Sequence, residues 1–223
     1  MALCAANLTT PAADPAEEEG PENYFVPKLY TGDGASTLAI TGLEFQPDLT
    51  WIKNRDATDS NCWFDSSRGV TELLKSDAHV AEATDADTLK SWTSDGFTVG
   101  ADVKVNTSSE KYVSWNWKLN GGTTASNSTG DKISTVQVDT DIGISIVQYT
   151  GNETAETIGH SLGVKPELIM VKCRSFDRSW AVQWVDVTNT LSYILNSTGS
   201  DDSHGYWNDT SPTSTVFTVG VGT

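Results

Sequence analysis

Few side chains of this sequence stand in patterns that support catalysis. The three histidines lie far apart, and none forms an HExxH motif or has a second histidine at ligand spacing. The chain has no Gly-x-Ser-x-Gly elbow, and the stretch GDGAST at residues 32–37 lacks the Gly-Lys-Ser/Thr ending of a phosphate loop. We therefore predict that the protein is not an enzyme and has no catalytic residue.

Two kinds of side chain remain as candidates for binding. Trp92 and Trp207 lie in polar segments and could stack on a sugar of a host glycan; the alternative is that each packs a loop onto its own domain. Two pairs of cations are spaced by two residues, so each pair shares one face of a strand. These cations are Lys53, Arg55, Lys172 and Arg174. In so acidic a chain we expect them to pair with carboxylates, with a ligand or partner contact as the alternative.

Acidic residues dominate the charged side chains. Thirty Asp and Glu against 14 Lys and Arg give a formal net charge of −16. Nucleic acid and anionic membrane surfaces are bound by basic patches, so the charge argues against both partners. Carboxylate pairs such as Asp85 and Asp87 could hold Ca²⁺ or serve a glycan-degrading enzyme, but no EF-hand spacing is present and so many acids produce such pairs by chance. We expect no cofactor and no metal, with Ca²⁺ as the alternative.

The apolar residues suggest buried cores but no membrane span. Three cysteines without a CxxC motif argue against a disulfide framework and against a zinc site. Cys62 and Cys173 lie in apolar, strand-like segments and are expected to be small core residues. No run of 18 apolar residues indicates a transmembrane helix.

Short strand-like segments recur along most of the chain, separated by turns rich in Gly, Ser, Thr, Asn and Asp. The segment KYVSWNWK at 111–118 alternates clearly, and we expect its bulky side, with Val113, Trp115 and Trp117, to face a core. The segment 69–92 could hold one short helix but shows no sustained apolar stripe. The pattern indicates an all-β protein.

A long internal repeat organises these segments. The stretch YTGDGASTLAITGLEFQPDLTWIKNR from Tyr30 is similar to YTGNETAETIGHSLGVKPELIMVKCR from Tyr149, without a gap and at an offset of 119 residues. Later landmarks keep the same order, and FTVG recurs at an offset of 120 residues. We also match two tryptophan pairs, Trp63 with Trp180 and Trp92 with Trp207. A period this long indicates tandem domains rather than a solenoid.

We therefore predict two tandem antiparallel β-sandwich domains of jelly-roll or lectin-like type. An N-terminal segment rich in Ala, Pro and acids precedes them and is expected to form an extended arm, which could anchor the protein to a partner. The predicted parts are the arm at 1–23, the first domain at 24–119, a Gly/Ser/Thr linker at 120–131 and the second domain at 132–223.

The second copy lacks a counterpart of the strand at 111–118, which would start at residue 231. A missing closing strand would leave an open sheet edge, which folded proteins avoid. We expect the natural chain to continue past Thr223, with a strand from another chain as the alternative.

The repeated motifs resemble a known group of proteins. YTGDG, ITGLEFQPDLTWIKNRDA, CWFDSSRG, SDGFTVGADVKVN and YVSWNWK, followed by YTGN, GHSLGVKPELIMVKCRS and WNDTSPTSTVFTVG, are similar to a tandem-repeat domain of tail-fibre and other virion appendage proteins. Those proteins belong to marine tailed bacteriophages, including phages of cyanobacteria. The resemblance covers the chain from about residue 24 onward. It implies an all-β, sandwich-like repeat in a virion structural protein and brings no catalytic residues.

From this resemblance we expect a component of a tail fibre, a spike or a capsid-attached fibre that contributes to host-surface attachment. The virion would be its location, after assembly in the host cytoplasm. Expected partners are other virion proteins reached through the N-terminal arm, a host surface glycan and further copies of the chain, a trimer by analogy with phage fibres. Weak contacts on repeated modules gain strength by multivalency. The alternatives are a capsid decoration protein and a carbohydrate-binding module without catalysis.

Overall fold

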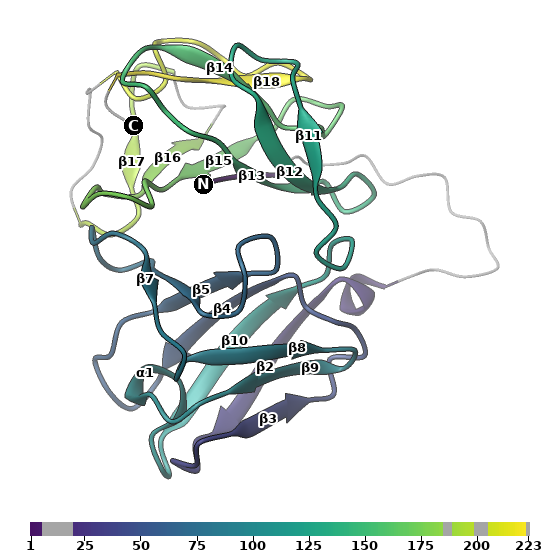
Figure 1. The fold of residues 1–223 in the computed structure, drawn as a ribbon, viewed down its shortest axis with the longest axis vertical. Coiled ribbons are helices and arrows are strands. Elements are labelled where there is room, and N and C mark those ends of the chain that lie inside the picture. The colour runs from purple at the N-terminus through teal and green to yellow at the C-terminus, as the bar shows by residue number, and fades with distance from the viewer. Residues whose placement is uncertain (6–19, 185–188, 199–204, 222–223) are drawn as a thin grey trace, which may run out of the picture. The chain divides into compact units, whose positions relative to one another are not determined.

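The computed structural model describes residues 1–5, 20–184, 189–198 and 205–221. Nearly all of its regular structure consists of antiparallel strands, which confirms the all-β class. The chain forms two compact units, each discontinuous in sequence (Figure 1). We call Thr10–Ala78 with Glu82–Gly122 the first unit, and Met1–Thr9 with His79–Ala81 and Thr123–Thr223 the second unit.

The first unit is built from two antiparallel sheets. The larger sheet has the order β2-β10-β4-β5-β6-β7 and the smaller one β3-β9-β8. Buried side chains of both sheets, such as Ile52 and Phe97, share one core, so the unit is a sandwich. The elements are η1 (Pro21–Asn23), β2 (Phe25–Thr31), β3 (Leu38–Thr41), β4 (Leu49–Asn54), β5 (Cys62–Asp65), β6 (Glu72–Lys75), β7 (Ala83–Thr84), β8 (Leu89–Thr93), β9 (Gly96–Val99), α1 (Val103–Asn106) and β10 (Lys111–Trp117).

The second unit has the same kind of construction. Its large sheet has the order β11-β12-β13-β1-β15-β16-β17, and β14 pairs with β18 in a second sheet. Ile169 from the large sheet and Phe217 from the small one lie in a common core. The strands are β1 (Ala2–Ala5), β11 (Ala125–Asn127), β12 (Ser134–Asp139), β13 (Ile144–Gln148), β14 (Glu156–Gly159), β15 (Leu168–Val171), β16 (Ala181–Trp184), β17 (Tyr193–Ile194) and β18 (Val216–Val219).

The predicted core side of β10 is wrong. The fully buried face carries Tyr112, Ser114 and Asn116, whereas the bulky Val113, Trp115 and Trp117 are half-buried on the other face. Polar side chains can occupy the core face here because they satisfy one another. The amide nitrogen of Asn116 donates to the Ser114 hydroxyl at 2.9 Å, and its amide oxygen accepts a bond from the Thr50 hydroxyl at 3.0 Å.

The strand registers relate the two units. Trp115 of β10 pairs with Trp51 of β4 in the first unit. Leu3 of β1 pairs with Met170 of β15 in the second unit, and Met170 lies 119 residues after Trp51. The neighbours on the other side, β2 and β13, show the same offset, and β1 and β10 both run antiparallel to their neighbours. In the second unit β1 therefore occupies the position that β10 has in the first.

This placement corrects the expected arm at 1–23 and the expected gap in the second copy. Ala2–Ala5 is a strand inside the large sheet of the second unit, visible beside β13 and β15 at the N-terminal mark in Figure 1. The sequence does not reveal it, because ALCA is too short for a period and sheet order need not follow chain order. The rest of the arm up to residue 19 lies outside the described residues.

The predicted linker at 120–131 is also partly wrong. Residues Ala125–Asn127 form β11, which pairs with β12. A sheet ladder is made by main-chain groups, so a segment of small polar side chains can form an edge strand although it lacks an apolar pattern.

Two of the matched landmarks are not structural equivalents. Trp51 pairs with Trp63, whereas Met170 pairs with Val182, so Val182 and not Trp180 corresponds to Trp63. The strand pairings also show a one-residue gap in the match between the stretches that begin at Tyr30 and Tyr149. Ile40 pairs with Phe97 and Ile158 with Phe217, which places β14 one residue out of the 119 register.

Trp92 and Trp207 are not equivalents either. The main-chain nitrogen of Gly100 donates to the carbonyl of Thr88 in the first unit, and that of Gly220 donates to the carbonyl of Tyr206 in the second. The residue after each acceptor is a buried core residue, Leu89 in the first unit and Trp207 in the second. Trp207 thus occupies the position of Leu89. Its match with Trp92 rests only on similar neighbouring residues in the sequence.

Candidate functional site

The repeated lysines cap the loops that follow their strands. The ammonium of Lys53 donates to the carbonyl oxygen of Asp59 at 2.9 Å, and that of Lys172 donates to the carbonyl oxygen of Arg178 at 2.7 Å. These acceptors are again 119 residues apart. The expected carboxylate partners are therefore wrong for the lysines, since main-chain oxygens take that role. Burial lowers the pKa of Lys172, which is fully enclosed.

The two arginines differ from each other. Arg174 donates to the side-chain oxygen of Gln148 at 2.8 Å and is half-buried. Arg55 has an exposed side chain, and its main-chain nitrogen donates to the carbonyl of Lys111 at 2.7 Å. The two-residue spacing thus places each lysine toward a loop and does not create a shared cationic site within either unit.

The tryptophans proposed for sugar stacking are engaged with their own cores. Trp207 is 1% exposed, and its indole nitrogen donates to the Ser192 hydroxyl at 3.0 Å. Trp92 is half-buried and packs against the core of the first unit. For Trp207 this burial agrees with the structural alternative, because an enclosed ring offers no face to a ligand.

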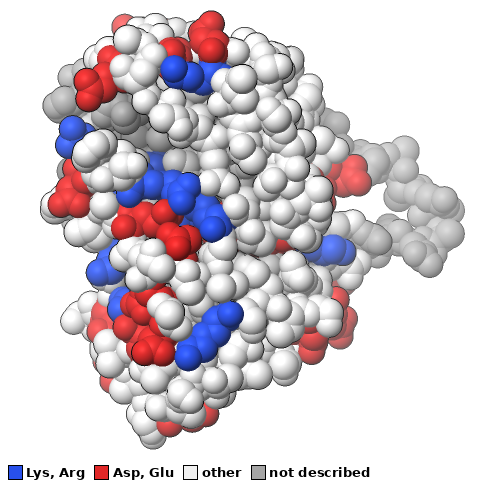
Figure 2. Space-filling view, viewed as in Figure 1, with Lys and Arg blue, Asp and Glu red and all other residues white. Residues whose placement is uncertain are grey.

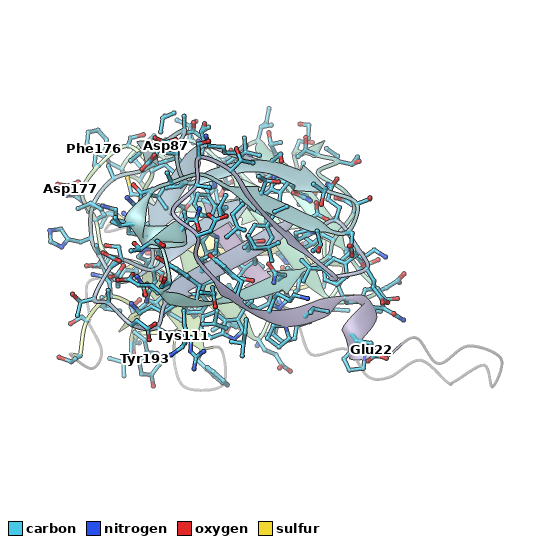
Figure 3. All side chains as sticks on the ribbon, turned by 90° about the horizontal axis from the view of Figure 1, so that it is seen from below. Glu22, Asp87, Lys111, Phe176, Asp177 and Tyr193 are labelled. Carbon is cyan, nitrogen blue, oxygen red and sulfur yellow. The ribbon has the colours of Figure 1, made fainter. Side chains whose placement is uncertain are left out.

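A different surface of the second unit carries accessible aromatic rings. A pocket of about 450 Å³ opens on β15, β16 and β17. We call it the outer hollow. It is lined by Leu168, Met170, Val182, Trp184, Tyr193, Ile194 and Leu195. Trp184 is 54% exposed and Tyr193 40% exposed, and Figure 3 shows Tyr193 directed away from the ribbon.

The repeat explains why the outer hollow exists. On the same face of the first unit, Trp51 lies between two other rings, with centroids 5.6 Å from Trp63 and 5.5 Å from Trp115. The second unit has Met170 and Val182 at the positions of Trp51 and Trp63, and Leu3 at that of Trp115. Three smaller side chains replace three indoles on this face. Two of these smaller side chains, Met170 and Val182, line the outer hollow, which therefore lies where the first unit has indole rings.

The two accessible rings of the outer hollow, Trp184 and Tyr193, were not predicted from the sequence. Trp184 follows Asp65 by 119 residues, so continuing the offset past the matched stretch would have shown an acid replaced by an exposed aromatic. No such signal marks Tyr193, which follows a segment whose sequence differs between the copies. A contiguous apolar and aromatic surface of this kind is typical of a contact site on a soluble protein.

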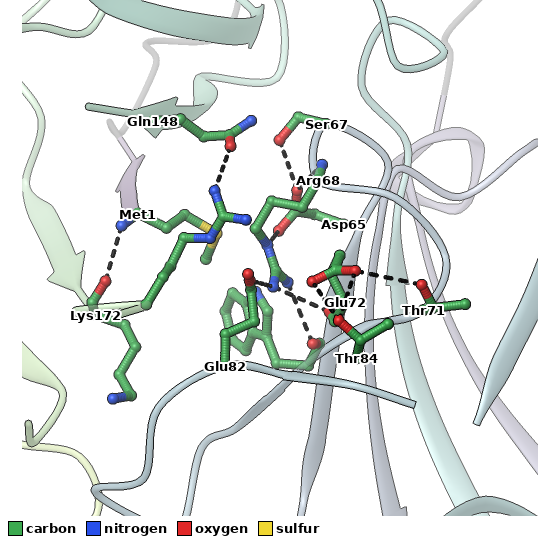
Figure 4. A network of polar contacts seen from close by, with 12 residues as sticks. Met1, Asp65, Ser67, Arg68, Thr71, Glu72, Glu82, Thr84, Gln148 and Lys172 are labelled. Atoms are coloured by element: carbon green, nitrogen blue, oxygen red, sulfur yellow. Dashed lines mark hydrogen bonds and ion pairs between the residues drawn. The ribbon is translucent and has the colours of Figure 1, made fainter. Parts of the chain in front are cut away.

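A second candidate feature is the position of β1 between β13 and β15, which we call the closing slot. The main-chain nitrogen of Met1 donates to the carbonyl of Lys172 at 2.8 Å, and the nitrogen of Lys172 returns a bond to Met1 at 2.9 Å. The first of these bonds is drawn in Figure 4. Ala2 and Cys4 are fully buried in the core of the unit. Burial raises the pKa of the Cys4 thiol, so this cysteine is a core residue and not a reactive one.

A buried ion-pair network belongs to the first unit. The Nε atom of Arg68 lies 2.6 Å from Asp65, and an Nη atom lies 2.5 Å from Glu82 (Figure 4). Arg68 also donates to the carbonyl oxygen of Glu72 at 3.0 Å. Burial opposes the charge of the guanidinium, but the two carboxylates more than offset it and raise the pKa of Arg68. All of these partners belong to the first unit, so the network has a structural role.

The one described histidine that is buried also has a structural role. The Nδ1 atom of His160 accepts a hydrogen bond from the main-chain nitrogen of Leu162 at 3.2 Å. Its Nε2 atom lies 3.3 Å from the carbonyl oxygen of Thr213, so Nε2 carries the proton of a neutral ring. Burial lowers the pKa of His160, which favours that neutral form.

Other acidic side chains accept hydrogen bonds from main-chain nitrogens of loops. Asp95 accepts bonds from the main-chain nitrogens of Glu44 and Gly42, and these bonds lower its pKa. Figure 2 shows acidic and basic side chains next to each other on the viewed face. In the described part of the chain no group of three or more His, Cys, Asp or Glu residues could hold a metal ion. The described residues also include no helix that is long and apolar enough to cross a membrane.

Comparison with known proteins gives a family without a known activity. No curated protein and no solved structure matches the chain. A family described as "Domain of unknown function (DUF7483)" matches residues 20–223, which include both repeats but not β1. Because this match covers most of the chain, the protein belongs to the DUF7483 family.

Proposed function

We propose that the protein is a structural component of a bacteriophage virion, placed in a tail fibre, a spike or a capsid-attached fibre, and that it contributes to attachment to the host surface. The motif resemblance described above supports this role. Two all-β units built on one plan also suit it, since rigid modules that recur along a chain can project a contact surface from a particle.

The observation that carries the proposal is the closure of the second unit by β1. The closing slot takes its strand from the far end of the sequence, whereas the first unit takes β10 from its own continuous segment. A sheet that accepts a strand from elsewhere can be joined to another part of an assembly through main-chain hydrogen bonds. Such a joint suits a structural protein better than a freely diffusing one.

The outer hollow supports the attachment part of the proposal. Its rim presents the rings of Trp184 and Tyr193, whose apolar faces can stack on the C–H face of a sugar ring. Each such contact is weak, but many copies on one particle act together. A host surface glycan is therefore the proposed ligand, and the hollow takes over the role that we first gave to Trp92 and Trp207.

The location is tested by electron microscopy of particles of the phage that encodes the chain, labelled with an antibody against it. Label on a tail fibre, a spike or a capsid-attached fibre supports the proposal. Uniform label over the capsid shell would instead assign the protein to capsid decoration. Particles without label, in which mass spectrometry also finds no peptide of the chain, would refute a virion role.

The attachment role is tested by binding of the purified protein to host cells. Trp184→Ala and Tyr193→Ala should each weaken binding by several-fold to about tenfold, as loss of an aromatic stacking contact of roughly 1 kcal/mol predicts. Phe176→Ala is the matched control, because this ring is 68% exposed but does not line the hollow. Equal binding by all three variants would exclude the hollow as the contact surface. The purified protein could bind host cells although the phage particles contain none of it. In that case a carbohydrate-binding module outside the virion is the better assignment.

A further inference from the structure

We propose that β1 is exchanged between copies of this chain, so that the β1 strand of one copy fills the closing slot of another. This inference goes beyond the proposed function and does not depend on where the protein lies in a particle. It concerns the second unit and its partner, which we infer to be a second copy of the same chain.

The closing slot needs a strand for a physical reason. It lies inside the sheet, so an empty slot would leave the facing main-chain groups of both β13 and β15 without partners. It would also expose the core on which Ala2 and Cys4 pack. An unfilled slot between two strands is therefore a stronger acceptor for a strand than an ordinary sheet edge.

The two units fill the equivalent position in different ways. In the first unit β10 follows β9 after a short connection that contains α1, so the strand belongs to one local segment. In the second unit β1 is separated from the next described element by residues 6–19, fourteen residues that can span at most about 50 Å when extended. The family match begins at residue 20. The matched family region thus contains the slot but not the strand that fills it here.

The same contacts form whether β1 comes from its own chain or from another. Both arrangements gain the ladders to β13 and β15 and bury the same side chains, so their difference is mainly one of chain entropy. Residues 6–19 tether β1 to its own chain, and a connection of this length gives an effective concentration in the millimolar range. Insertion within one chain should dominate in dilute solution, and exchange should take over where copies are held together at comparable local concentration.

Exchange would give assemblies of a definite kind. Each copy donates one strand and accepts one strand, so the contact is heterologous unless two copies exchange reciprocally. Reciprocal exchange closes a dimer, and one-way exchange gives rings or open chains. The residues that identify such a joint are Cys4 and its cross-strand neighbour Ser145, which pair directly in register.

A cross-link at this pair tests the proposal. The variant Ser145→Cys is made in the full chain together with Cys62→Ala and Cys173→Ser, which removes the other described thiols. Opposed residues of antiparallel strands have Cα atoms about 4.5–5.5 Å apart, which a disulfide can bridge. The protein is refolded from urea at micromolar and at millimolar concentration, oxidised with oxidised glutathione and separated by non-reducing electrophoresis.

We expect an intramolecular disulfide at micromolar protein, with less than about a tenth of the chains in larger species, and a ladder of disulfide-linked oligomers at millimolar protein. The matched control adds Cys4→Ser and should give no ladder. Only the intramolecular product at both concentrations would overturn the proposal, as would a ladder that persists in the control. If the variant does not fold, size-exclusion chromatography of the native sequence after the same two refolding conditions decides: oligomers that dissociate only after unfolding support exchange, and monomer throughout refutes it.

Discussion

Placing a carboxylate at Cys4 should destabilise the second unit, because this side chain is fully enclosed between β13 and β15. An aspartate at that position must be protonated to remain buried. Its ordinary pKa is about 3.9, and each pH unit above that value costs about 1.36 kcal/mol. The cost of protonation in Cys4→Asp is therefore about 4 kcal/mol at pH 7 and about 1.5 kcal/mol at pH 5. If β1 leaves the slot before the rest of the unit unfolds, the loss of stability is limited to the free energy with which the strand docks.

The matched control is Cys4→Asn, which has nearly the same shape but does not titrate. The first unit has Asn116 at the equivalent position, where its amide is satisfied by Thr50 and Ser114. The second unit has Ile169 and Ala2 at the corresponding neighbours, so the control loses about 1–3 kcal/mol through unpaired polar groups at every pH. The difference in the free energy of unfolding between Cys4→Asp and Cys4→Asn therefore measures the cost of keeping the aspartate protonated.

Urea unfolding followed by tryptophan fluorescence at pH 7 and pH 5 measures both variants. We expect Cys4→Asp to be less stable than Cys4→Asn by up to about 4 kcal/mol at pH 7, with the difference shrinking toward pH 5. Stability of both variants equal to that of the unchanged sequence at pH 7 would refute the buried position of Cys4. A difference that does not depend on pH would show that ionisation is not its cause.

Three further predictions concern groups with a structural role. Lys172→Met should lower the free energy of unfolding by about 1–3 kcal/mol, because it leaves the carbonyl oxygen of Arg178 without its donor; chemical denaturation checks this, and an unchanged midpoint would contradict the loop-capping role. Stability should fall as pH drops below about 6.5, because the lowered pKa of His160 means that the unfolded chain binds the proton more readily; His160→Gln should flatten this part of the pH profile, and an unaltered slope would rule His160 out as its source. Arg68→Met should cost about 3–5 kcal/mol by leaving the buried carboxylate of Asp65 uncompensated, and thermal unfolding that shifts by less than a degree or two would contradict this.

The fold class could be predicted from the sequence because strand alternation and turn composition are local signals. The offset of 119 residues found from Tyr30 and Tyr149 recurs in the pairing of β4 with β5 and of β15 with β16. Pattern alone misjudged which face of β10 is buried. Asn116 and Ser114 look like surface residues, yet the hydrogen bond between them and the bond from Thr50 to Asn116 make them compatible with the core.

The candidate site could be predicted only in part, because its elements depend on non-local pairing. The four residues of β1 carry no period, and their position between β13 and β15 is fixed by strands about 140 and more residues away. The outer hollow arises from a difference between the two copies, so similarity between them could not reveal it. For Trp207 the sequence left open whether the ring contacts a ligand or its own domain, and only the position of the ring in the core decides this.

Amide hydrogen exchange of the intact protein tests most directly the claim that the second unit repeats the first and is closed by β1. The amides of Ala2–Ala5 should exchange as slowly as those of β13 and β15, because all three strands belong to one ladder. Cys4→Asp at pH 7 should speed exchange in β1 and in both neighbours together. Rapid exchange at Ala2–Ala5 while β13 and β15 stay protected would contradict the claim, because the slot would then not be closed by this strand.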